Sequence, residues 1–223
     1  MTEPSVEPVL DHVVLAARDR AAIEEALAAL GLRAGSGRAI PGAGLSNVMV
    51  AVGSQLLELH YPDGSPVAEG APPYAQAQRA ALAAHPDVPL VPVAWVVRYP
   101  SEAELRAASA RVGYPVVEVP AEPPNEAPHL LGGLGAAFER PWLPALIHWS
   151  AAPHLPPTLV EDRGRGPNEG RLTLDVSGPA DELRAWCGAL PRRVEIGAGT
   201  AGPLRAWLRR PDGTSAALGL PPE

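Results

Sequence analysis

The chain has 223 residues, of which 46% are hydrophobic, and its formal net charge is −7 at pH 7. This length supports one ordinary domain with a sizeable buried core, and the 28 prolines and 22 glycines predict many stiff connections. All 18 basic residues are arginine, which excludes lysine Schiff-base chemistry and a phosphate-binding loop of the GxxxxGK type. The acidic balance argues against nucleic-acid binding. The single cysteine, Cys187, excludes an intrachain disulfide and any site built from several cysteines.

Neither a membrane span nor a signal peptide is expected from the sequence. No apolar run approaches the roughly 18 residues that a membrane span requires. The first ten residues, MTEPSVEPVL, are acidic and contain proline, unlike the basic start and apolar centre of a signal peptide. We therefore expect a cytoplasmic protein that does not bind a membrane.

Three segments share the order of a strand, a helix and a helix-ending residue. In the first, residues 11–17 predict a strand, and Asp19 is a good N-cap for the helix that follows. Apolar residues at i, i+3, i+4 and i+7 from Ile23 form one stripe along that helix, and Gly31 ends it.

The second and third segments repeat this order. In residues 91–113, Ser101 and Glu104 predict a capping box at the start of the helix. In residues 171–191, Cys187 lies on the apolar stripe of the predicted helix, which indicates an inert core thiol.

Each segment continues into extended stretches, so the pattern predicts three βαβββ units. One unit cannot bury its apolar sheet face alone, and we expect an α+β fold in which the first two units form a curved sheet around a concave site. The expected parts of one compact domain are the first unit (1–62), an insert with a short helix near 74–84 (63–89), the second unit with a long proline-rich loop at 120–144 (90–150), a linker (151–170) and the third unit (171–223).

The repeat and three short segments resemble the vicinal oxygen chelate superfamily, and within it most closely the glyoxalase-like domain group. The segments are DHVVLAARD at the start of the first unit, GRAIPGAGLSN in its middle and LLELHYP at its end. The resemblance covers nearly the whole chain. Gly44 and Asn47 match the Gly/Pro-rich segment of the group, whereas Ile40 and Leu45 stand where His and Thr are expected.

The resemblance implies metal ligands on the first and last strands of each unit. His12 lies on the first strand and Glu58 on the last strand of the first unit, and alternate strand residues share a face, so His60 points the same way as Glu58. A carboxylate between leucines is costly to bury unless it is paired or bound to metal. When the helix-ending glycines are aligned, Ala94 stands opposite His12, and the last strand of the second unit sets His148 opposite Glu58.

His12, Glu58 and His148 thus form a candidate site for iron, zinc, manganese or nickel. The ion would polarise an oxygen-rich substrate, with a metal-bound water or a carboxylate such as Glu58 as the base. A cup without metal is the open alternative, with His12 and Glu58 hydrogen-bonded to each other. His60 is either a spare ligand or general base, or an exposed histidine at the end of its strand.

Other residues carry weaker signals. Arg38 and Asn47 could meet an anionic or carbonyl ligand at the rim, or lie in water and in a turn. Trp149 either lines the pocket or belongs to the core. His129, in a proline-rich connection, is expected at the surface. The glycines of residues 35–44 follow a helix rather than open one, which argues against a dinucleotide loop.

Two functions therefore remain open. The first is a metal-dependent lyase, isomerase or dioxygenase acting on a small oxygen-rich metabolite. The second is a metal-free protein that binds or sequesters a small molecule in the same cup, as resistance proteins of the superfamily do. The resemblance also implies a homodimer, because the superfamily often completes its cups by pairing units. The substrate cannot be named, because the loops carry no motif.

Overall fold

The computed structural model describes residues 7–35, 37–71, 73–119, 128–150, 168–197 and 204–219. Within these ranges, twelve strands form two sheets, one of eight strands and one of four. None of the helices in the described part of the chain is long and apolar enough to cross a membrane.

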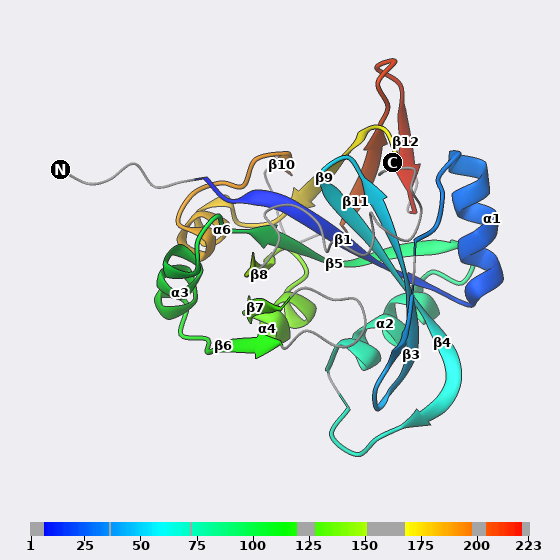
Figure 1. Cartoon of the computed structure of the whole chain (residues 1–223), viewed down its shortest axis with the longest axis horizontal. Helices are drawn as coiled ribbons and strands as arrows, with labels where there is room; N and C mark the ends of the chain where they lie inside the picture. Colours follow the sequence, from blue (N-terminus) through cyan, green and yellow to red (C-terminus); the bar gives the residue numbers. More distant parts are fainter. Residues whose placement is uncertain are drawn as a thin grey trace.

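The larger sheet joins eight strands in the order β2-β3-β4-β1-β5-β8-β7-β6 (Figure 1). The antiparallel pair of β1 and β5 forms the centre of the sheet. The sheet has two halves, β1 to β4 and β5 to β8, and in each half the first strand lies parallel to the last strand. Two halves of like connectivity share this curled mixed sheet, which confirms the predicted α+β fold. The strands are β1 (Val9–Ala17), β2 (Ala39–Ile40), β3 (Ala43–Val52), β4 (Gln55–Val67), β5 (Leu90–Arg98), β6 (Val116–Val119), β7 (His129–Gly132) and β8 (Ala145–Trp149).

The third segment keeps the order of elements but pairs its strands differently. In the smaller sheet, β9 lies parallel to β10 and antiparallel to β11, and β12 forms the edge beside β11. The first strand therefore does not meet the last, as it does in both halves of the larger sheet. The strands are β9 (Arg171–Ser177), β10 (Val194–Gly197), β11 (Arg205–Arg209) and β12 (Ser215–Leu218).

Local capping determines where the main helices begin. The Asp19 carboxylate accepts a hydrogen bond from the Ala22 N–H at 2.8 Å, and Gly31 closes the same helix with a φ of 70°. Ser101 and Glu104 pair at the start of the helix after β5, as predicted, with the Ser101 hydroxyl accepting from the Glu104 N–H and donating to the Glu104 carboxylate. The helices are α1 (Arg20–Leu30), α2 (Pro73–Ala84), α3 (Glu102–Arg111), α4 (Leu134–Glu139) and α6 (Ala180–Cys187).

The expectation that residues 120–144 form a loop is wrong. This stretch contains β7 and α4, which are four and six residues long. Elements this short offer too few residues for a period to show in the sequence. Residues 120–127 and most of the predicted linker lie outside the described residues.

The two faces of the larger sheet carry different layers. One face, with Val13 on β1, packs in a single core with α1, α3, α6 and the smaller sheet. The concave face, with Val14, carries α2 and α4 (Figure 1). A register shift in β1 between Leu10 and His12 places Leu10 in the core and His12 on the concave face.

Two arginines oppose each other on the exposed face of the smaller sheet. Arg171 on β9 pairs directly with Arg209 on β11, and like charges at opposed positions destabilise an antiparallel pair. Arg209 donates to the hydroxyls of Thr173 and Ser215. The side chain of Arg171 has no hydrogen-bond or ion-pair partner among the described residues.

We expect Arg171→Gln to raise the free energy of unfolding by about 0.5 kcal/mol, because it removes this repulsion. Urea denaturation at low and high salt measures the effect, and the gain should shrink as salt screens the two charges. Arg184→Gln is the matched control, because that exposed arginine already pairs with Asp181 at 2.7 Å. A loss of stability in Arg171→Gln would contradict the prediction.

Candidate functional site

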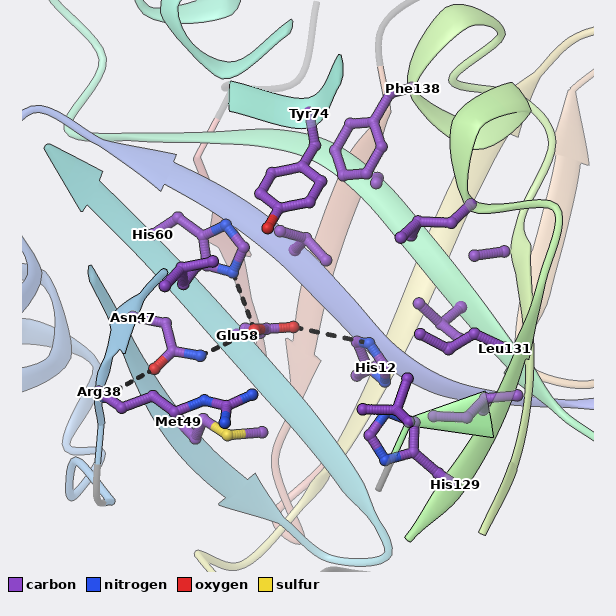
Figure 2. Close-up of a pocket in the computed structure, with 18 of the residues that line it drawn as sticks. His12, Arg38, Asn47, Met49, Glu58, His60, Tyr74, His129, Leu131 and Phe138 are labelled. Carbon is purple, nitrogen blue, oxygen red and sulfur yellow. Dashed lines mark hydrogen bonds and ion pairs between the residues drawn. The ribbon is translucent and has the colours of Figure 1, made fainter. Parts of the chain in front are cut away.

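A cavity of about 200 Å³ lies on the concave face of the larger sheet (Figure 2). Strands of the sheet form its floor, and side chains from α2 and α4 form its roof. Most of its polar side chains come from the first half of the sheet, namely His12, Arg38, Asn47, Glu58 and His60. The second half contributes a mainly apolar wall that includes Ala94, Val96, Leu131, Ala145, Ile147 and Trp149.

Glu58 is the centre of the polar wall. Its Oε1 accepts a hydrogen bond from Asn47 Nδ2 at 2.9 Å and lies 2.9 Å from His60 Nε2, while its Oε2 lies 3.7 Å from His12 Nε2 (Figure 2). Burial alone would raise the pKa of Glu58. Three neighbours act in the opposite direction and hold this pKa well below its usual range. They are His60, through its charge when protonated and its contact with the carboxylate, His12, through its charge when protonated, and Asn47, through its hydrogen bond. The side chain is 20% exposed, so an ionised carboxylate faces the cavity.

His12 is oriented by a buried carboxylate behind it. Its Nδ1 lies 3.0 Å from Asp11 Oδ1, and Asp11 also accepts hydrogen bonds from Arg98 at 3.1 Å and from the Trp149 indole at 3.3 Å. Asp11 is 1% exposed, and Arg98 compensates its charge. Because a carboxylate only accepts, Nδ1 is the ring atom that carries hydrogen, and His12 presents Nε2 to the cavity.

His60 is tied to the helix that covers the cup. Its Nδ1 lies 2.5 Å from the side-chain Nε2 of Gln78 on α2, and both residues are buried. Because an amide N–H donates, Nδ1 accepts and the ring hydrogen is on Nε2, beside Glu58. The geometry of this N–H does not form a hydrogen bond, so among the described residues Nε2 has only the 2.9 Å contact with Glu58 Oε1. The alternative of an exposed histidine at the strand end is therefore wrong.

The second half of the cup lacks a counterpart of Glu58. When the two halves are aligned by their helix-ending glycines, Val96 corresponds to Val14. Val14 pairs with Glu58 across β1 and β4, and Val96 pairs with Ala145 across β5 and β8. A methyl group thus stands where the first half has a carboxylate.

The structure contradicts the expected position of His148. Ala145, Ile147 and Trp149 line the cavity from β8, so His148 faces the other side of the sheet, where its Nδ1 lies 3.1 Å from the backbone oxygen of Tyr99. The strand sequence ALIHW is apolar on both faces, and alternation therefore did not reveal which face meets the cup.

The remaining donors do not fit a tightly bound divalent ion. Zinc sites in proteins use three or four protein ligands, whereas His12 and Glu58 supply two. His60 has its Nδ1 bonded to Gln78 and its hydrogen on Nε2. Within the described residues, no group of three His, Cys, Asp or Glu side chains is arranged to hold a metal. The predicted ligand set of His12, Glu58 and His148 is therefore wrong in its third member.

The three residues expected to meet a ligand all line the cavity. Asn47 is 4% exposed, and it accepts from the Arg38 backbone N–H while donating to Glu58, so it holds the carboxylate in place. Arg38 reaches the cavity from an exposed position at its rim. The Trp149 ring packs against His129 with a centroid distance of 4.8 Å. A role of these residues in ligand binding stays a prediction.

Three aromatic side chains of the cavity were not expected there from the sequence. His129, expected at the surface, lines the cavity from β7, so that expectation is wrong. Tyr74 of α2 and Phe138 of α4 meet over the cup with ring centroids 5.4 Å apart (Figure 2). No local pattern marks either aromatic residue, because their contact arises only when two distant helices pack together.

The curled sheet of two like halves with a cup on its concave face is the fold of the vicinal oxygen chelate proteins. Residues 10–186 match the glyoxalase-like domain family, and the chain therefore belongs to this family, as the resemblance predicted. No curated protein sequence matches the chain.

Solved structures share the fold at low sequence identity. A hypothetical protein from Staphylococcus aureus has a TM-score of 0.58 and 10% identity, over 88% of this chain and 88% of that chain. The methylmalonyl-CoA epimerase from Mycobacterium tuberculosis has a TM-score of 0.44 and 16% identity, over 69% of this chain and 94% of that chain. The likeness to the Staphylococcus aureus protein concerns the fold alone.

Proposed function

We propose that this glyoxalase-like protein binds a small organic molecule in its cup and does so without a metal ion. The observation that carries the proposal is the asymmetry of the cavity, in which an ionised carboxylate flanked by His12 and Asn47 faces an apolar wall. Binding pockets for small molecules combine a mainly apolar lining with a few convergent polar groups. The polar wall would orient the ligand, and the apolar wall would supply binding free energy by burial.

The metal-dependent lyase, isomerase or dioxygenase has weaker support. Such chemistry needs an ion held firmly with open positions for substrate, and His12 and Glu58 are too few donors for that.

The cup is lined by residues of one chain, so a homodimer is not needed to form it. Dimerisation and a cytoplasmic location stay predictions.

Metal analysis tests the proposal directly. We expect the protein purified without chelators to contain far less than one equivalent of iron, zinc, manganese or nickel. Adding these ions should not raise the melting temperature more than it does in His12→Ala. One equivalent of metal that disappears in His12→Ala would overturn the metal-free proposal. His148→Ala is the matched control, because His148 faces away from the cup.

A second candidate is a metal-free enzyme in which Glu58 acts as a general base. The observation that favours it is that Glu58 Oε2 faces the cavity and makes no hydrogen bond within the described part of the chain, where His12 Nε2 lies 3.7 Å from it. In that case, hydrogen of a bound ligand should exchange with solvent deuterium, and Glu58→Gln should stop the exchange while binding persists. Binding without exchange favours the binding protein.

A further inference from the structure

His12 and Glu58 direct two hydrogen-bond acceptors at one region of the cavity. Asp11, which also pairs with Arg98, accepts from His12 Nδ1 at 3.0 Å, so the tautomer with its hydrogen on Nδ1 has a lone pair at Nε2. This Nε2 lies 3.7 Å from Glu58 Oε2. An N–H···O hydrogen bond spans roughly 2.7–3.2 Å. The two atoms therefore do not satisfy each other.

The other groups around Glu58 are used on its second oxygen. Asn47 donates to Oε1, and His60 Nε2 lies 2.9 Å from the same atom. Among the described residues, no donor makes a hydrogen bond to Oε2. An ionised oxygen that faces a mostly apolar cavity is energetically unfavourable unless a hydrogen-bond donor lies next to it. The polar wall therefore favours a ligand that brings a donor to Oε2.

The number of hydrogens on the donor distinguishes the ligand classes. A donor atom placed between Nε2 and Oε2 can lie within hydrogen-bond distance of both, because they are only 3.7 Å apart. A hydroxyl has one hydrogen and satisfies one of the two acceptors, whereas an ammonium group has three hydrogens and satisfies both. A carboxylate ligand would place a third acceptor there.

The charges and aromatic rings of the cup favour the same class. Arg98 compensates the charge of the buried Asp11, so Glu58 is the carboxylate that presents a negative charge to the region beside His12 Nε2. The positive charge of Arg38 comes from an exposed position at the rim of the cavity. Tyr74 and Phe138 line the cavity above this wall (Figure 2), and aromatic faces attract cations.

We infer that the cup binds a small primary amine in its ammonium form, with the nitrogen between His12 Nε2 and Glu58 Oε2 and an apolar body against the second half of the sheet. This inference rests on the proposed function and adds the chemical class of the ligand. The body would contact the apolar side chains of Val96, Leu131, Phe138 and Ile147.

Three probes with one carbon skeleton test the inference, namely benzylamine, benzyl alcohol and benzoate. Titration calorimetry of the full chain at neutral pH should show benzylamine binding about tenfold more tightly than benzyl alcohol, because charge-assisted hydrogen bonds are about twice as strong as neutral ones. Benzoate should bind most weakly. Glu58→Gln keeps the shape of the side chain without its charge and should remove the preference for the amine. His12→Phe keeps a ring without the acceptor and should weaken amine binding.

Two controls separate this inference from the proposed function. Glu24→Gln, an exposed carboxylate on α1, should leave the ranking of probes unchanged, and Ala145→Phe, which fills the cup, should abolish binding of all three. If the probes bind wild type but not Ala145→Phe, and alcohol or benzoate equals or exceeds the amine, the ligand class is wrong while the cup still binds small molecules. If no probe binds wild type, both the ligand class and the small-molecule cup are overturned.

Discussion

Replacing Gln55 by leucine is expected to lower the free energy of unfolding by about 3 kcal/mol, although the two side chains have similar volumes. Gln55 begins β4, and its side chain is 1% exposed. Its amide donates to the backbone oxygens of Leu10 at 3.2 Å and Leu172 at 3.1 Å, and accepts from the Leu172 N–H at 2.8 Å. A single side chain thus joins β1 of the larger sheet to β9 of the smaller one.

The expected loss is large because leucine would leave buried backbone groups without partners. Each buried donor or acceptor left unsatisfied costs about 1–3 kcal/mol, more than the net gain from an ordinary hydrogen bond. Leu10 and Leu172 are fully buried, so water cannot easily replace the amide. Part of the cost is offset by the added apolar volume, and we therefore expect about 3 kcal/mol rather than the full sum.

Thermal unfolding measures this effect. For a chain of this size, 3 kcal/mol corresponds to a fall of roughly 6–12 °C in the melting temperature. Gln76→Leu is the matched control, because Gln76 is exposed on α2 and its replacement should change stability by no more than about 0.5 kcal/mol. If Gln55→Leu proves as stable as this control, the amide does not hold the two sheets together.

Features set by nearby residues could be predicted from the sequence. The helix start after Asp19 and the capping box of Ser101 depend on contacts within a few residues, and both are present. The placement of Glu58 and His60 on one face also followed from local alternation, because Leu57 and Leu59 mark the opposite face as core. The position of His12 beside them was implied by the family resemblance.

Features set by tertiary packing could not be predicted in this way. On β8 both faces are buried, so nothing in ALIHW distinguishes the side of Ile147 from that of His148. The contact of Gln78 with His60 and the position of Tyr74 require α2 to fold over the sheet. The pairing of β9 with β10 could not be predicted either, because the order of elements alone does not determine which strands pair.

Ala145→Glu is expected to give the cup a divalent metal site. Ala145 pairs with Val96 as Glu58 pairs with Val14, and it faces the cavity. A glutamate there would add a third donor to His12 and Glu58, which reaches the number that catalytic zinc sites use. Without metal, the new carboxylate lies in an apolar wall, and we expect a loss of roughly 2 kcal/mol in stability.

Zinc should restore that loss in Ala145→Glu alone. A ligand that binds only the folded state adds about 2.7 kcal/mol of stability at a concentration one hundred times its dissociation constant, so the melting temperature should rise clearly with zinc. Ala145→Gln is the matched control, because it has the same size without the charge and should lose stability with no rescue by zinc. Adding His12→Ala to Ala145→Glu should remove the rescue, because only two donors remain. If zinc does not stabilise Ala145→Glu beyond Ala145→Gln, Ala145 is not the counterpart of Glu58.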